Sequence, residues 1–257
     1  MQNIVAPLAN MQINADVINE DGKISTEYQR FFQNNHLYTN SLKNRSFPCT
    51  TLNPDFNILS ANGTTPVSEG SPNDTEFVKK WFLWSDGGLN DFLLTPTAYS
   101  ATEQGITGSL YYINMQITTL DEPLYIYNVN YSTTGQFNGA GLYSGEQLAI
   151  SAAVYNNNPN TPKVRFSVML SDGTEIESPG LFMQPGMNNV YSVLQMPDFS
   201  AVNMGLVPYA QIRLKFEDIY VSNTNLDIYY VKCELSNYAT PLQINHIEQI
   251  LICNAIT

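Results

Sequence analysis

Three stretches of the chain alternate apolar and polar residues with a period of two, and this alternation constrains the fold most. Between residues 163 and 170, apolar residues take every second place, with Lys163, Arg165 and Ser167 among the residues between them. Residues 147–155 and 211–217 follow the same pattern. A period of two places one set of side chains on a buried strand face and the other set on a solvated face. A register slip of one residue would expose the apolar set, so we predict firmly aligned antiparallel strands. The apolar positions are Leu148, Ile150, Ala152 and Val154, then Val164, Phe166, Val168 and Leu170, then Ile212, Leu214 and Phe216.

Strand signals elsewhere extend this pattern over most of the chain. Residues 109–118, 123–131, 189–196 and 226–235 bring the expected number of strands to about eight or nine. Short strands at regular spacing, separated by Gly, Asn and Pro, are typical of a sandwich or jelly roll. We therefore expect a mainly β chain, with an antiparallel, jelly-roll-like β-sandwich at residues 57–257. A unit of this size buries enough apolar surface to need no disulfide or metal.

The first part of the chain has a different character. Residues 1–23 carry only scattered apolar side chains and end in a turn signal, which predicts an extended arm. A capping box at Thr26 and Gln29 then predicts a helix at residues 24–45, followed by a linker at 46–56. The helix has the four-and-three spacing of a coiled-coil seam, although an amphipathic helix packed on its own domain is the alternative. The seam positions are Ile24, Tyr28, Phe31, Asn35, Tyr38 and Leu42.

The charge balance excludes several classes of partner. The net charge is −12, with only 11 Lys and Arg spread along 257 residues. A nucleic-acid-binding protein needs a basic stripe, so we expect no nucleic-acid partner. No window reaches 18 uninterrupted apolar residues, so we expect no membrane insertion, and the N-terminus does not resemble a signal peptide. The three cysteines lack a CxxC spacing and are interpreted as small buried apolar residues rather than zinc ligands.

The chain shows no catalytic motif. Its two histidines, His36 and His246, have no nucleophile motif around them, and phosphate-loop and metalloprotease motifs are absent. Acidic residues gather at Asp121–Glu122, at Asp172–Glu177 and at Glu217–Asp218, all at expected strand ends or turns, where carboxylates are usually solvated. We therefore expect no enzyme activity and no cofactor. A polysaccharide-degrading enzyme, which would use a carboxylate pair, is an alternative.

Tyrosines are the candidates for ligand binding. Tyr125, Tyr127 and Tyr131 alternate on one expected strand, so their side chains share a face. Tyr143 and Tyr155 flank polar loops. Aromatic rings can stack on the C–H faces of sugars, and Asn, Asp or Gln nearby can bond the hydroxyls. The alternative is that these tyrosines pack in the core or in a subunit interface.

Several short motifs, in order along the chain, resemble one known module. They are Asn53-Pro54-Asp55-Phe56, the expected strand Phe77–Trp84, Val231-Lys232-Cys233-Glu234-Leu235 and Gln249-Ile250-Leu251-Ile252-Cys253. Their order over residues 53–253 resembles the carbohydrate-binding-module-like β-sandwich at the C-terminus of bacteriophage tail and head fibres. The segment from Val17 to Gln33 resembles the short N-terminal attachment and trimerisation element of such virion proteins.

This resemblance implies a function. The chain would be a phage virion fibre or similar appendage, a homotrimer that docks on other virion proteins through its N-terminal arm and binds host-surface carbohydrate. A purely structural head-decoration or tail-adaptor protein is the alternative. Some modules of this kind hold a structural calcium between an early loop and the last strand, where this chain has Asp55 and Asp227. No dense Asp loop is present, so we predict no metal site.

Overall fold

The computed structural model describes residues 51, 53–85, 90–99, 110–131, 143–199, 209–217 and 223–240. The predicted arm at 1–23, the predicted helix at 24–45 and the six seam positions lie outside these residues. The chain divides into two units at the Pro48–Cys49 bond, and all described residues belong to the second unit. Within the described part, no helix is long and apolar enough to cross a membrane.

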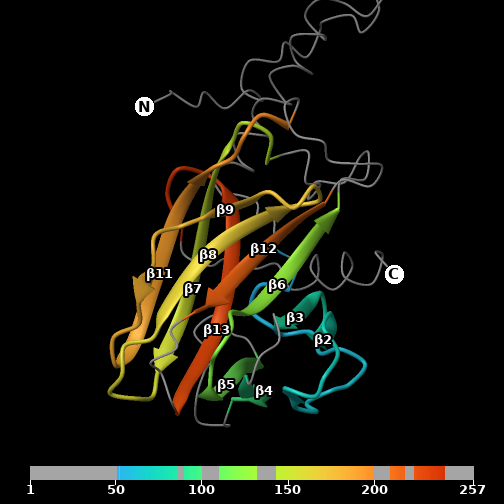
Figure 1. Cartoon of the computed structure of the whole chain (residues 1–257), viewed down its shortest axis with the longest axis vertical. Coiled ribbons are helices and arrows are strands. Elements are labelled where there is room, and N and C mark those ends of the chain that lie inside the picture. The colour runs from blue at the N-terminus through green and yellow to red at the C-terminus, as the bar shows by residue number, and fades with distance from the viewer. Residues whose placement is uncertain are drawn as a thin grey trace, which may run out of the picture. The chain divides into compact units, whose positions relative to one another are not determined.

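The described chain folds into two antiparallel sheets, as the alternation predicts (Figure 1). The six-stranded sheet has the order β1-β4-β5-β13-β7-β11. β5 and β13 occupy its middle, β7 follows β13, and β11 forms one edge. The strand bounds are β1 Val67–Ser68, β4 Asp91–Ala98, β5 Tyr111–Thr119, β7 Gln147–Asn156, β11 Gly186–Gln195 and β13 Thr224–Leu235.

The second sheet has seven strands in the order β10-β8-β12-β6-β3-β2, with β9 also paired to β8. Figure 1 shows β8, β12 and β6 side by side in this layer. Neighbours in this sheet are antiparallel throughout. The bounds are β2 Thr75–Val78, β3 Trp81–Ser85, β6 Leu124–Tyr131, β8 Lys163–Leu170, β9 Glu175–Glu177, β10 Leu181–Phe182 and β12 Tyr209–Phe216.

The core lies between the sheets and contains the apolar set predicted from the alternation. All eleven of those side chains are buried, which confirms the strand faces. Trp81 is also buried, with its ring edge-on to Phe56 at 5.3 Å and its Nε1–H donating to Asn53 O at 2.9 Å. Cys233 is fully buried, as predicted for a small apolar residue.

The outer faces are more buried than a two-faced strand pattern predicts. Ser167 was expected in solvent but is fully buried, because Glu175 of the neighbouring strand covers it and accepts its hydroxyl hydrogen bond at 2.6 Å. β7 is buried on both faces over Leu148–Val154. Its outer positions Ala149, Ser151 and Ala153 are small, and they lie beside Glu234, Lys232 and Tyr230 of β13.

The segment around Thr51 and Pro54 continues the sheet where β5 stops. β5 pairs with β13 only from Thr224 to Ile228. Beyond that point, Val231 N–H donates to Pro54 O at 2.9 Å, and the Thr51 hydroxyl donates to Val231 O at 3.3 Å. Of the predicted linker at 46–56, Thr51 and residues 53–56 are described, and all of them are buried.

Candidate functional site

The outer face of the six-stranded sheet carries a network of amides around one carboxylate. Asn114 on β5 and Asp227 on β13 are cross-strand partners. Asn114 Nδ2 donates to Asp227 Oδ1 at 2.7 Å, and Asn157 Nδ2, just after β7, donates to Asp227 Oδ2 at 2.9 Å. Asn114 Nδ2 also donates to Asn225 Oδ1, and Gln116 Nε2 donates to Asn114 Oδ1. We call Asn114, Gln116, Asn157, Asn225 and Asp227 the Asp227 cluster.

Three tyrosines lie on the same sheet face beside this cluster. Tyr99 follows β4, Tyr112 precedes Asn114 by two residues on β5, and Tyr229 lies at the bulge of β13. The ring centroids are 5.2 Å apart for Tyr99–Tyr112, 5.7 Å for Tyr112–Tyr229 and 6.0 Å for Tyr99–Tyr229. Tyr229 continues the outward alternation of Asn225 and Asp227, and the bulge shifts the alternation beyond it so that Val231 and Cys233 face the core. We call these residues the tyrosine cluster.

The hydroxyl of Tyr99 remains protonated at neutral pH. Burial raises the pKa of Tyr99, and the neighbouring Tyr229 and Tyr112, with Asp55 and Asp227, raise it further. A protonated phenol can donate a hydrogen bond as well as accept one. The tyrosine cluster therefore adds a hydrogen-bond donor to its aromatic surface.

Exposed aromatic residues flank the other side of the Asp227 cluster. Tyr155 on β7 is the cross-strand neighbour of Asp227 and of Met187 on β11. Tyr155 is 38% exposed, and Tyr191, further along β11, is 57% exposed. This sheet face therefore carries the Asp227 cluster with the tyrosine cluster on one side of it and Tyr155 and Tyr191 on the other. Sequence reasoning identified Tyr155 as a ligand-binding candidate, and the structure places it in this arrangement.

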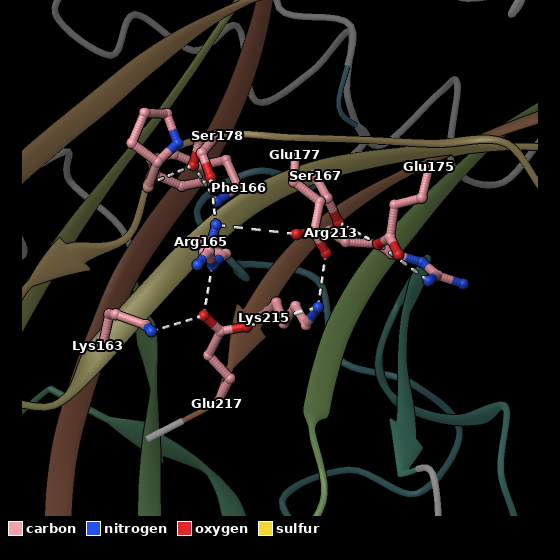
Figure 2. Close-up of polar contacts among 11 residues, drawn as sticks. Lys163, Arg165, Phe166, Ser167, Glu175, Glu177, Ser178, Arg213, Lys215 and Glu217 are labelled. Atoms are coloured by element: carbon pink, nitrogen blue, oxygen red, sulfur yellow. Dashed lines mark hydrogen bonds and ion pairs between the residues drawn. The ribbon is translucent and has the colours of Figure 1, made fainter. Parts of the chain in front are cut away.

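The opposite sheet has a different outer face, made of alternating charges (Figure 2). Lys163 Nζ lies 3.0 Å from Glu217 Oε1, and Arg165 also bonds Glu217. Lys215 Nζ lies 2.6 Å from Glu177 Oε1 and bridges to Glu217 at 3.5 Å. The ion-pair ladder, as we call it, consists of Lys163, Arg165, Glu175, Glu177, Arg213, Lys215 and Glu217. It holds four of the 11 Lys and Arg of the chain, and each is paired with a glutamate.

Tyr125 and Tyr127 lie on this ladder face of β6, and both are buried. The Arg213 guanidinium carbon is 4.9 Å from the Tyr125 ring centroid. Tyr127 stacks on Phe82 at 5.5 Å, and its hydroxyl bonds Asp74. Of the other predicted ligand-binding tyrosines, Tyr143 lies in the core without exposed surface, and Tyr131 lies at the end of β6. The structure therefore does not bring the five tyrosines to one place.

The Glu217 carboxylate of the ladder is held in its ionised form. Burial alone would raise the pKa of the Glu217 carboxyl, but hydrogen bonds and charge from Arg165 and Lys163 outweigh burial and lower its pKa. A general acid in glycoside hydrolysis needs a raised pKa. Glu217 has the opposite shift, so its surroundings do not suit that role. Asp121, Glu122 and Asp172, from the other acidic groups in the sequence, are exposed.

Asp55 and Asp227 were the weak metal candidates of the sequence. Asp55 is buried at 2% exposure in the turn after Pro54, and Asp227 is half-buried on β13. Both affect the pKa of Tyr99, so they lie in the same region. Among the described residues, no group of three or more His, Cys, Asp or Glu could hold a metal ion.

Sequence reasoning missed most of the polar and aromatic residues of this face. Asn114, Asn157 and Asp227 come from three separate strands or turns, so no local motif joins them. One signal was present in β5, where Tyr112, Asn114 and Gln116 alternate with the core residues Ile113 and Met115. That period of two marks a polar and aromatic strand face, but it does not identify the neighbouring strand.

No family model matches the chain, and no curated protein matches it. Among solved structures, it is similar to the enzymatically active domain of tailspike protein 4 of bacteriophage CBA120, with 15% identity and a TM-score of 0.38 over 66% of this chain and 21% of that one. It is also similar to the CBM22-1 xylan-binding domain of Paenibacillus barcinonensis Xyn10C, with 11% identity and a TM-score of 0.37 over 68% and 95% of the two chains. An arabinose-bound MgGH51 arabinofuranosidase gives 8% identity and a TM-score of 0.42 over 72% and 30%. At TM-scores of 0.37 to 0.42, these likenesses assign no function.

Proposed function

We propose that this chain is a carbohydrate-binding protein that binds glycans on the outer face of its six-stranded sheet. The Asp227 cluster carries this proposal, because it places a carboxyl group and several amides between two aromatic surfaces. An ionised carboxylate can accept about four hydrogen bonds, and the amides of Asn114 and Asn157 supply two of them. Sugar hydroxyls can donate the further hydrogen bonds that the Asp227 carboxylate is able to accept.

The aromatic residues beside this cluster suit the apolar faces of a sugar ring. Tyr155 is exposed and adjacent to Asp227, so a ring stacked on Tyr155 would direct its hydroxyls toward the carboxylate. Tyr112 and Tyr229 offer a second aromatic surface on the other side. A binding site with a few placed polar groups among aromatic residues is the usual composition of a ligand site in proteins.

We further propose that the chain is a structural part of a phage virion, such as a tail or head fibre. The motif order over residues 53–253 and the segment from Val17 to Gln33 support this proposal by their resemblance to fibre proteins. In this proposal the N-terminal arm docks on other virion proteins, residues 24–45 hold three copies together, and the sandwich binds carbohydrate on the host surface. The purely structural role remains the alternative, and it predicts no glycan binding.

Glycan binding is tested with the full-length chain on an array of bacterial surface polysaccharides. We expect binding that falls about tenfold or more in Asp227→Ala, because a hydrogen bond to a charged group contributes about 1.5–3 kcal/mol. Tyr155→Ala should weaken binding in the same direction through loss of stacking. Tyr238→Ala changes another exposed tyrosine outside the site and is the matched control. Equal binding by all four proteins would refute this site, and no binding to host polysaccharide would favour the structural alternative.

The proposed trimer is tested by light scattering on the full-length chain. We expect a mass that is a multiple of three chains, and we expect Phe31→Asp to reduce it, because a charge in a coiled-coil seam opposes association. A stable monomer at micromolar concentration would contradict the trimer.

A further inference from the structure

One strand edge of the sandwich lacks the features that normally prevent pairing with another chain. β11 forms an edge of the six-stranded sheet and is ten residues long. Natural edge strands are usually short, bulged, or protected by charged residues or proline. β11 pairs with β7 over all ten residues without a register shift, and its sequence contains no charged residue and no proline.

The other edges in the described part of the chain are protected, and β11 differs from them. β1 and β10 have two residues each, and β9 has three. β2 has four residues and a register shift against β3. β4, which β1 covers only in part, carries Pro96 and begins at Asp91. Among the described strands, β11 is therefore the long edge without such protection.

The backbone of β11 presents hydrogen-bonding groups along this edge. Met196 N–H donates to Glu146 O at 2.9 Å, so the even-numbered positions bond toward β7. On the β13 side of β7, Ser236 N–H donates to Gln147 O at 3.0 Å. Odd-numbered residues of β7 therefore bond toward β13, and even-numbered ones bond toward β11. In an antiparallel pair, the positions between those bonded residues direct N–H and C=O away from the partner. In β11 these positions are Met187, Asn189, Tyr191, Val193 and Gln195.

The side chains at the same positions are exposed and mainly apolar. Met187 is 45% exposed, Tyr191 57% and Val193 36%. Only Leu194 among the ten residues of β11 is buried. The chain has a net charge of −12, which opposes close approach of two copies over most surfaces. The uncharged edge of β11 is a place where two copies can meet without repulsion between strand residues.

We propose that β11 pairs antiparallel with β11 of a second copy of this chain about a twofold axis. The pairing would join two six-stranded sheets into one continuous sheet, and it does not depend on glycan binding. A symmetric contact of identical strands is self-complementary, because each copy supplies the same donors and acceptors. With the axis at Val190, Met187 lies opposite Val193 of the second copy, and Asn189 lies opposite Tyr191 of the second copy. Apolar residues thus meet apolar residues, and an amide meets a phenol.

The test is the mass of the full-length chain in solution, measured by light scattering at micromolar concentration without glycan. Tyr191→Lys places like charges on both sides of the contact. Val193→Pro removes an N–H that points toward the edge and not toward β7, so it blocks pairing with little loss inside the sheet. Tyr238→Lys makes the same chemical change at a similarly exposed tyrosine outside β11 and serves as the control.

We expect the wild-type protein and Tyr238→Lys to have twice the mass of Tyr191→Lys and of Val193→Pro. If residues 24–45 form a trimer, the expected masses are six and three chains, and the factor of two is unchanged. Near-ultraviolet circular dichroism checks that each variant is folded. If Val193→Pro does not fold, the comparison with Tyr191→Lys decides the result. Equal masses for wild-type protein and folded Tyr191→Lys would overturn the proposal. Because no glycan is present, this outcome is separate from the proposed glycan binding.

Discussion

A buried ion pair, Lys232–Glu234, lies on the outer face of β13. Lys232 Nζ lies 2.9 Å from Glu234 Oε2, and the two side chains are 2% and 0% exposed. Thr240 completes the contact, because its carbonyl oxygen accepts from Lys232 at 2.5 Å and its N–H donates to Glu234 at 2.9 Å. The positive charge of Lys232 and the negative charge of Glu234 compensate each other. Removal of one side chain would leave the charge of the other buried without a partner of opposite sign.

We expect Lys232→Met to lower the free energy of unfolding by about 3–5 kcal/mol, because the Glu234 charge stays buried. The double variant Lys232→Met with Glu234→Gln should lose less, since no unpaired charge remains. Lys163→Met, in the half-exposed ladder, is the control and should cost no more than about 1 kcal/mol. Urea unfolding measures all three. A double variant as unstable as Lys232→Met alone would contradict this account.

Glu217 gives the ladder a pH dependence. Its pKa is lowered in the folded protein, where Arg165 and Lys163 outweigh the effect of burial. A group with a lowered folded pKa contributes stability above its unfolded pKa of about 4.3, and this contribution is lost as the pH falls through the folded pKa. The wild-type protein should therefore lose more stability on acidification from about pH 6 to about pH 3 than Glu217→Gln does.

Urea unfolding midpoints across this pH range measure the difference. Asp121→Asn changes an exposed carboxylate at a turn and is the matched control. We expect its acid sensitivity to follow that of the wild-type protein. The same loss of stability in wild-type protein and Glu217→Gln would show that the ladder does not respond to pH in this way.

At the scale of elements, the contact between Thr51 and β13 closes the sheet where β5 ends. The Thr51 hydroxyl donates to Val231 O and accepts from Cys233 N–H, both at 3.3 Å. Thr51→Val keeps the volume but removes both bonds, so we expect a loss of about 1–3 kcal/mol in the free energy of unfolding. Thr51→Ser keeps the hydroxyl and should retain most of the stability. Chemical unfolding compares them, and equal losses in both variants would refute the hydrogen-bonding role.

The strands themselves were largely predictable, and the errors have local causes. The alternating stretches became β7, β8 and β12, because a period of two is set by residue type alone. The sequence around Phe77–Trp84 suggested one strand, but the structure has a hairpin there, with a turn at Lys79–Lys80 and a positive φ of 68° at Lys80. No glycine or proline marks this turn, so composition could not reveal it. The short strands β1, β9 and β10 have too few residues for any period.

At the scale of the whole molecule, the fold class was predictable and the candidate site was not. The sandwich follows from many independent strand patterns that agree with one another. The Asp227 cluster depends instead on which strands become neighbours, since Asn114 and Asp227 meet only because β5 pairs with β13. Arg213 shows the same limit: it occupies a polar position of β12, yet it is 6% exposed because Tyr125, Gln211 and Glu175 surround it.

The junction of Thr51 and Pro54 with β13 also determines how the sandwich would carry a tensile load. A pull on the chain before residue 51 reaches β13 first, through the bonds at Val231 and Cys233. β13 has neighbours on both sides and pairs with β7 from Leu226 to Leu235. The load is therefore shared across the middle of a sheet, where many hydrogen bonds must break together. It does not peel away an edge strand one bond at a time.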